Sequence, residues 1–220
     1  SQNQPLIADS PKERRRESAP IVDREEQPLA LISSFDLITP DSQEVCATDT
    51  PWRAGSHRIS TDEHLPTGGC LAVEMRLFSP AYIFLVGQDA TGDLTRMFPS
   101  NCPDFQTIDG FIQPDKLFQF PPLFDPQARI LGLEGTPGIE RVYAIAITAP
   151  DLAKRFEYQL DEIQGLCQPG RSFPERLLAG GRRRSHERIH QWQRYLNHLA
   201  VQNPEKVQWR EFSFWHDRPL

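Results

Sequence analysis

The sequence has no long apolar segment and no excess of positive charge. Its longest uninterrupted apolar run covers only residues 81–87, whereas a membrane-spanning helix needs about 20 such residues. Acidic residues outnumber basic ones, 30 against 24, which gives a net charge of −6. Because a general nucleic-acid binder needs basic side chains to neutralise phosphates, we expect neither a transmembrane segment in this chain nor a nucleic-acid partner.

Motifs that carry catalytic chemistry are also scarce. Residues 67–69 (Thr-Gly-Gly) are too short for a phosphate-binding loop and precede an expected strand instead of a helix. Ser56, His57, Asp62 and His64 lie close in sequence, but no G-x-S-x-G elbow surrounds them. We therefore expect no catalytic residue and no cofactor.

The cysteines are few and widely spaced, without the C-x-x-C motif of a zinc site. An even number of isolated cysteines suits disulfides in an oxidising compartment, and four buried thiols are the alternative. We expect a periplasmic or otherwise extracytoplasmic location, with a cytoplasmic one as the alternative. The disulfide candidates are Cys46, Cys70, Cys102 and Cys167.

Proline and charge are abundant in the first part of the chain. Residues 12–17 and 23–26 are dense in both signs of charge, and prolines interrupt any periodicity. Such a segment cannot bury enough apolar surface to offset the entropy of ordering. We predict a disordered or extended tether over residues 1–45, in which 29–38 can dock or form helical turns, and a single β-rich domain over 46–220.

Alternating and continuous apolar patterns predict strands from residue 71 onward. Residues 71–78 alternate with period two, and 82–86 form a continuous apolar run typical of a strand buried on both faces. With 93–98 these segments suggest a three-stranded meander, followed by a hairpin ending near residue 148. In such a meander Cys70 and Cys102 lie more than about 20 Å apart, so they are not expected to form a disulfide.

The last third of the chain combines helical and strand patterns. Apolar residues recur at three- and four-residue spacing in 151–166 and again in about 185–202, and 207–215 alternates as a final strand. We predict a mainly β fold, with an antiparallel β-sandwich-like core, two C-terminal α-helices and a final edge strand.

Two features near the C-terminus indicate partner binding. Three consecutive arginines precede the second expected helix, where the helix dipole opposes them, which favours an external acidic partner. In the last strand alternation places aromatic residues on both faces, so the strand is either buried twice or presents an interaction patch. The predicted partner-binding residues are Arg182, Arg183, Arg184, Phe212, Phe214 and Trp215.

One motif suggests a different function. Residues 186–190 match H-E-x-x-H, in which His186 and His190 share a helix face to bind zinc and Glu187 acts as general base. Arg188 and the three preceding arginines oppose a metal cation there. A zinc-dependent hydrolase is therefore the alternative function, against a solvated helix face.

A series of landmarks follows in order over about residues 69–150: 71–77, 82–85, Asp89-x-x-Gly92, 97–101, 107–110, 116–118, 137–140 and 144–150. In their order and spacing these segments resemble the domain of unknown function 4384 family. Met97 departs from it, because the family usually has Leu or Ile there. The resemblance implies a bacterial accessory or sensory domain, of the kind attached to Ser/Thr kinases or caspase-like peptidases, without catalytic residues. We expect a non-catalytic protein-interaction or sensory module whose partner is another protein, either in the same polypeptide or in a signalling or secretion assembly. Sensing of a small ligand is a third interpretation.

Overall fold

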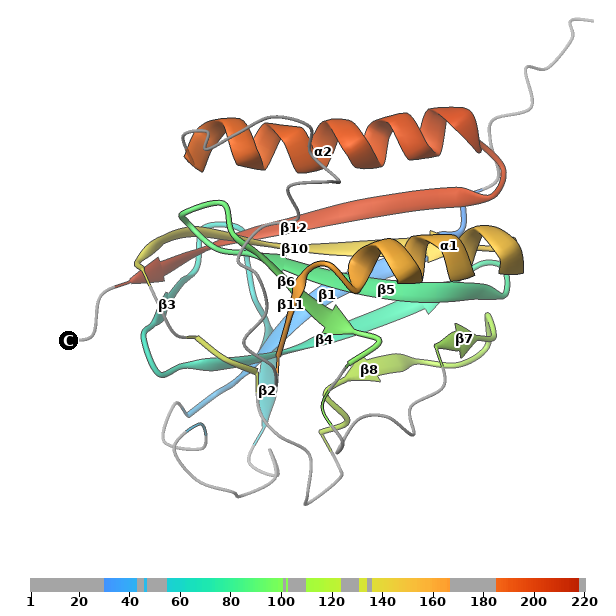
Figure 1. Cartoon of the computed structure of the whole chain (residues 1–220). Coiled ribbons are helices and arrows are strands. Elements are labelled where there is room, and N and C mark those ends of the chain that lie inside the picture. Colours follow the sequence, from blue (N-terminus) through green and yellow to red (C-terminus); the bar gives the residue numbers. More distant parts are fainter. Residues whose placement is uncertain are drawn as a thin grey trace, which may run out of the picture.

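The part of the chain that the structure describes forms two β-sheets and a layer of two helices (Figure 1). The computed structural model describes residues 30–42, 46, 55–100, 102, 110–123, 131–133, 136–166 and 185–217. The first sheet contains β1 (Ile32–Pro40), β2 (Ser56–Arg58), β4 (Cys70–Leu77), β8 (Phe118–Phe120) and β9 (Leu131–Gly132). Its order is β2-β1-β4-β8, and β9 also pairs with β4.

The second sheet is larger and carries the helices. Its strands are β3 (His64–Pro66), β5 (Ala81–Gln88), β6 (Leu94–Phe98), β7 (Phe111–Ile112), β10 (Gly138–Ile147), β11 (Gln164–Gly165) and β12 (Val207–Asp217). The order is β11-β6-β5-β10-β12-β3, with β7 also pairing with β5. The helices are α1 (Pro150–Leu160) and α2 (Ser185–Gln202). The β12 strand lies near one edge, where the short β3 is the last strand among the described residues.

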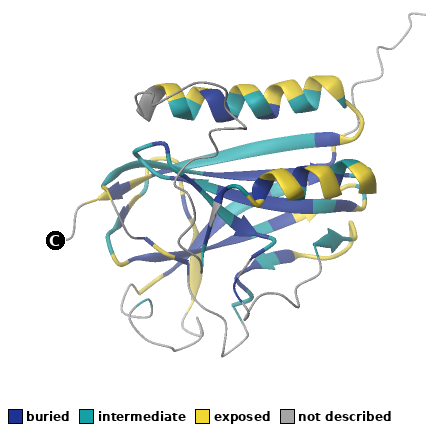
Figure 2. Ribbon diagram, in the orientation of Figure 1, coloured by how far each residue is buried: buried dark blue, intermediate teal, exposed yellow. Residues whose placement is uncertain are grey.

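The main core fills the space between the two sheets. Val73 and Met75 of β4 pack in one cluster with Ile83 and Leu85 of β5, as alternation along both strands requires. On its other face, the second sheet packs against the helices. Figure 2 shows the central strands as mostly buried. This layered packing confirms the mainly β, sandwich-like fold predicted from the sequence.

The helical layer forms a second core. Phe84 of β5 meets Phe156 of α1 edge to face, with ring centroids 5.0 Å apart. Tyr143 of β10 meets Trp192 of α2 with centroids 6.2 Å apart. The continuous apolar run of β5 is therefore buried on both faces. No helix among the described residues is long and apolar enough to cross a membrane.

The predicted meander is wrong. The β4 strand pairs with β1, β8 and β9 in the first sheet, whereas β5 pairs with β6, β7 and β10 in the second. The turn at Ser79 and Pro80 therefore crosses from one sheet to the other. Only the β5–β6 hairpin of the expected meander forms.

The tether predicted over residues 1–45 does not extend as far as expected, because β1 occupies 32–40 in the middle of the first sheet. The start of β1 is also bonded to β12: the Gln208 side-chain oxygen accepts from the amides of Leu31 and Ile32 at 2.6 and 2.7 Å. These bonds join the two sheets at the β12 edge. Residues 1–29 lie outside the described residues.

A disulfide joins Cys46 to Cys70 at the start of β4, with Cα atoms 5.5 Å apart. Cys70 is therefore not bonded to Cys102, although the geometric reason derived from the meander does not hold. Cys102 is itself disulfide-bonded. Cys167 lies outside the described residues.

Candidate functional site

Histidine–carboxylate pairs gather at the end of the sandwich where β12 ends. The parallel pairing of β3 with β12 sets His64, Leu65 and Pro66 opposite Trp215, His216 and Asp217. In addition, the Trp215 amide donates to the Glu63 carbonyl at 3.3 Å. We call this region the histidine end; it comprises Asp41, His57, Glu63, His64, Thr67, Glu140, Trp215, His216 and Asp217.

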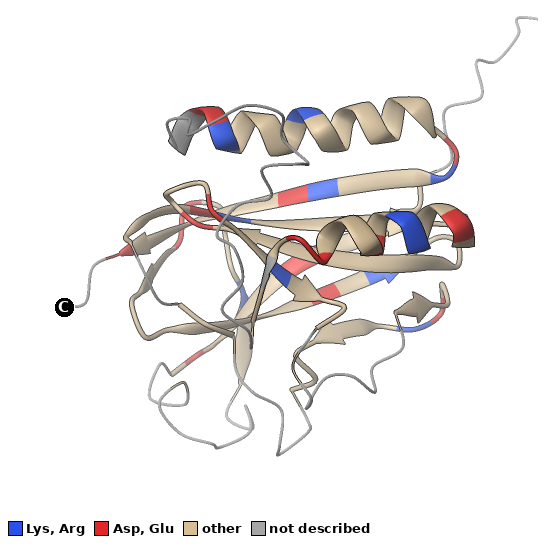
Figure 3. Ribbon diagram, in the orientation of Figure 1, with Lys and Arg blue, Asp and Glu red and all other residues tan. Residues whose placement is uncertain are grey.

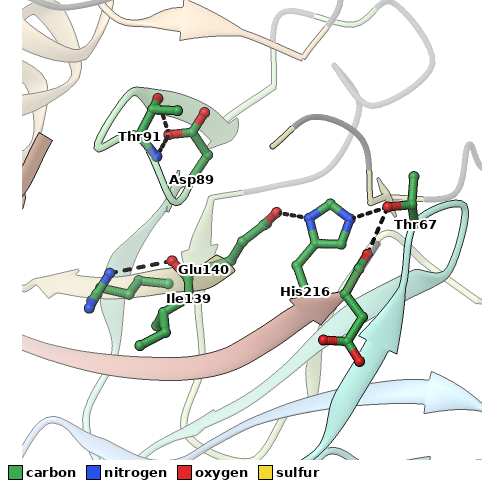
Figure 4. A network of polar contacts seen from close by, with 8 residues as sticks. Thr67, Asp89, Thr91, Ile139, Glu140 and His216 are labelled. Atoms are coloured by element: carbon green, nitrogen blue, oxygen red, sulfur yellow. Dashed lines mark hydrogen bonds and ion pairs between the residues drawn. The ribbon is translucent and has the colours of Figure 1, made fainter. Parts of the chain in front are cut away.

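A buried hydrogen-bond chain forms the centre of the histidine end (Figure 4). His216 Nδ1 lies 2.5 Å from Glu140 Oε1, and its Nε2 lies 2.9 Å from Thr67 Oγ1. The Thr67 hydroxyl also donates to the Asp217 carbonyl at 2.8 Å. The His216 side chain is 0% exposed and that of Glu140 is 16% exposed. The chain therefore joins β10, β12 and the residue after β3 in a place that solvent barely reaches.

Burial governs the electrostatics of this chain. Desolvation is the largest influence on Glu140 and raises the pKa of its carboxyl above the ordinary value. The contact with His216 lowers it, and the nearby charge of Asp89 raises it further. The net effect favours a proton in the Glu140–His216 pair.

Thr67, His216 and Glu140 are arranged like a nucleophile, its base and an orienting carboxylate. Acyl transfer would also need backbone N–H donors aimed at a developing oxyanion. The amides around Thr67 are already used, because Thr67 donates to Asp217, Gly68 to Leu133 and Gly69 to Pro66. The geometry therefore favours a structural hydrogen-bond network, which holds β3, β10 and β12 together, over a catalytic triad.

Two exposed pairs flank the buried chain. His57 of β2 lies between two carboxylates, with Nδ1 2.9 Å from Asp41 Oδ1 and Nε2 2.8 Å from Glu63 Oε1. Hydrogen bonds to Glu63 and then to Asp41 raise the pKa of His57 above its ordinary value. Because Glu63 immediately precedes β3, this contact links the first sheet to the β3 segment.

The second exposed pair supports an aromatic surface. His64 Nδ1 lies 3.0 Å from Asp217 Oδ1, and its ring stacks on Trp215 with centroids 5.7 Å apart and an angle of 6° between the planes. Trp215 remains 43% exposed. The stack therefore forms a flat platform beside a carboxylate at the surface.

The β5–β6 hairpin approaches the histidine end from another side. A Cβ on Gly138, which has φ +150°, would lie 2.6 Å from the Cβ of Ala90. Only glycine allows this close approach without displacement. Asp89 Oδ1 accepts from the amides of Thr91 and Asp93, both at 2.9 Å, so this carboxylate stabilises the turn near Glu140.

The predicted partner-binding residues do not form one surface. Phe214 is 1% exposed and belongs to the core between the sheets, so its prediction as a surface contact is wrong. Phe212 is partly buried against the same core, while Trp209 packs on the helical side. The strand thus packs on both faces, with residues 208–213 half-buried, and Trp215 is the exposed aromatic residue. Arg182, Arg183 and Arg184 lie outside the described residues.

The H-E-x-x-H segment begins α2. Glu187 and His190 are exposed, and His190 Nδ1 lies 3.3 Å from Gln193 Oε1. The His186 side chain lies outside the described residues. Among the described residues, no three His, Cys, Asp or Glu side chains are placed to hold a metal ion. The zinc-hydrolase alternative stays a prediction.

The buried chain was not found from the sequence. Glu140 and His216 are 76 residues apart, and Thr67 and His216 are 149 apart, so no local motif unites them. One signal was present: His216 has the same parity as Phe212 and Phe214 along β12, which places it on the inner face. A histidine at a core position needs buried hydrogen-bond partners.

Comparison with known families supports the resemblance noted in the sequence. Residues 64–165 match the family model described as a domain of unknown function (DUF4384), which is the family that the sequence resembles. The match begins at β3 and ends at β11. It therefore includes His64, Thr67 and Glu140 but neither His216 nor Trp215. Comparisons with curated proteins and with solved structures found no match.

Proposed function

We propose that this chain is a non-catalytic protein-interaction or sensory module, the extracytoplasmic part of a bacterial signalling or secretion-associated protein. The observation that carries the proposal is the exposed platform of Trp215 and His64 beside a closed buried network. Functional sites that bind macromolecules commonly present an exposed aromatic side chain on a rigid support. Here the support is the paired ends of β3 and β12.

The disulfide supports the extracytoplasmic part of the proposal. Cys46 and Cys70 are bonded across two segments of the first sheet region, and such bonds persist in oxidising compartments and are rare in the cytosol. The expected bacterial context comes from the family resemblance.

The chemistry around Trp215 favours a partner segment that carries arginine or lysine. The face of a tryptophan ring attracts cations. Asp217 and Asp41, with side chains 52% and 56% exposed, add negative charge nearby, as does Glu63 at 24%. In Figure 3 the tip of β12 and the adjacent hairpin carry acidic positions. The platform therefore complements a basic segment of another protein.

Calorimetric titration with a short peptide of alternating arginine and serine tests this proposal. We expect salt-dependent binding that Trp215→Ala weakens about tenfold, the effect of losing a cation–π contact of about 1.4 kcal/mol. Tyr158→Ala is the matched control, because Tyr158 is an exposed aromatic on α1, at 76%. Equal binding by the wild-type protein and the Trp215→Ala variant would refute the proposed surface.

A further inference from the structure

The short strand β3 is held to β12 by side chains as well as by its backbone. Three residue pairs join the two strands, and the Thr67 hydroxyl reaches both His216 and Asp217. We propose that protonation of the Glu140–His216 pair locks β3 onto β12, so that proton binding controls the platform of Trp215 and His64. The control of recognition rests on the proposed function, whereas the lock itself does not.

A count of hydrogens shows why a second proton tightens the lock. The Thr67 hydroxyl has one hydrogen, and it donates to the Asp217 carbonyl at 2.8 Å. The contact between Thr67 Oγ1 and His216 Nε2 at 2.9 Å then needs a hydrogen on Nε2. The contact between His216 Nδ1 and Glu140 at 2.5 Å needs another. All three contacts are satisfied together only when the pair holds two hydrogens.

Loss of one of these protons leaves the network with one bond fewer. A neutral His216 that donates from Nδ1 to the Glu140 carboxylate accepts at Nε2. The Thr67 hydroxyl must then turn toward Nε2, and the Asp217 carbonyl keeps only the Thr67 amide, at 3.2 Å. The link from Thr67 to the end of β12 is thereby weakened.

The charged groups around the Glu140–His216 pair also favour its protonated state. The raised pKa of Glu140 reflects burial first and the charge of Asp89, on the hairpin, last. A carboxyl whose pKa is raised on folding contributes stability at low pH, and this is lost as the pH rises through the raised pKa. His57, which faces Asp41 and Glu63, also has a raised pKa, so it too favours the locked state below about pH 6.5.

The platform depends on the lock because β3 supplies half of it. His64 is the first residue of β3, and Thr67 follows the last. A weaker link at Thr67 removes one of the supports of the His64–Trp215 stack. The β3–β12 pairing, the contact of His64 with Asp217 and the backbone bonds to Asp217 and Glu63 remain. Recognition at Trp215 should therefore be strongest when the pair is protonated.

An NMR titration of the ¹⁵N-labelled protein between about pH 5 and 8 tests the lock without any partner. We expect the Leu65 and Thr67 amides and the Trp215 indole N–H to shift with one common midpoint. Above that midpoint, hydrogen exchange at Thr67, corrected for its intrinsic pH dependence, should be about fivefold faster, the effect of one lost hydrogen bond.

Variants make the test specific. Glu140→Gln should abolish the common midpoint, and Thr67→Val should remove the change in exchange. Glu74→Gln is the control, because Glu74 is a half-buried carboxylate bonded to Gln119 and not to a histidine; it should titrate as the wild-type protein does. If Glu140→Gln disturbs folding, the Thr67→Val result decides.

The outcomes separate the two proposals. An unchanged midpoint in Glu140→Gln or an unchanged exchange response in Thr67→Val would overturn the lock, whether or not the arginine peptide binds. A titrating lock with no peptide binding at any pH would leave the lock intact and refute the proposed recognition surface.

Discussion

Truncation of two neighbouring aromatic residues of β12 should lower stability by very different amounts. Phe214 is 1% exposed and packs between the sheets, whereas Trp215 is 43% exposed and points to the other face. Removing a buried phenylalanine side chain costs about 3–5 kcal/mol, from lost burial and the cavity that remains. We therefore expect Phe214→Ala to lower the free energy of unfolding by about 4 kcal/mol.

The Trp215→Ala variant provides the matched comparison. The substitution removes the stacked contact of the Trp215 ring with His64 at the surface. We therefore expect the free energy of unfolding to fall by less than about 1 kcal/mol. In a domain of this size 1 kcal/mol corresponds to about 2–4 °C. The melting temperature should therefore fall by about 8–16 °C for Phe214→Ala and by less than about 4 °C for Trp215→Ala.

Urea denaturation followed by circular dichroism measures both free energies. Equal costs for the two variants would refute the assignment of Phe214 to the core and Trp215 to the surface. A loss of less than about 1.5 kcal/mol for Phe214→Ala would also refute this assignment, because cavity formation at a closely packed site destabilises a protein by more than that.

Three further predictions concern other parts of the molecule. Replacing both Cys46 and Cys70, which are 24 residues apart, by alanine should cost about 3.5 kcal/mol through the entropy of the opened loop, measured by urea unfolding; no change would contradict a structural role. Burial raises the pKa of Tyr195 to about 12, so the stability contributed by this neutral phenol should be lost as the pH rises toward 12. The ultraviolet titration of Tyr195→Phe should lack the component that ionises near that pH. Metal analysis of protein purified without an affinity tag should show no stoichiometric zinc; bound zinc that disappears in His190→Ala would instead support the hydrolase alternative.

Elements with strong local periodicity were predictable from the sequence. The continuous apolar run of β5 indicated a strand buried on both faces, and the structure places it between the inter-sheet core and the helices. Phe156 and Leu160 of α1 recur at helical spacing, and both are buried. In these cases the pattern alone specifies which faces must be covered.

Long-range pairing was not predictable in the same way. The β1 strand follows a charged, proline-rich segment, and its pairing depends on β4 and on Gln208, which is 177 residues from Leu31. The assignment of β4 and β5 to one meander failed because alternation identifies a buried face but not the sheet that covers it. The buried chain of Glu140, His216 and Thr67 was missed for a similar reason, since only the paired strands bring these residues together.

The response of stability to pH tests most directly the claim that the histidine end binds a proton to hold β3. The free energies of unfolding of the wild-type protein and of Glu140→Gln should be compared at about pH 5.5 and about pH 7.5, within the range where histidine-linked pairs titrate. Because the raised pKa of Glu140 favours the protonated fold, the wild-type protein should lose stability relative to the variant as the pH rises. A difference between the two proteins that stays constant, or that grows in favour of the wild-type protein at the higher pH, would contradict the account.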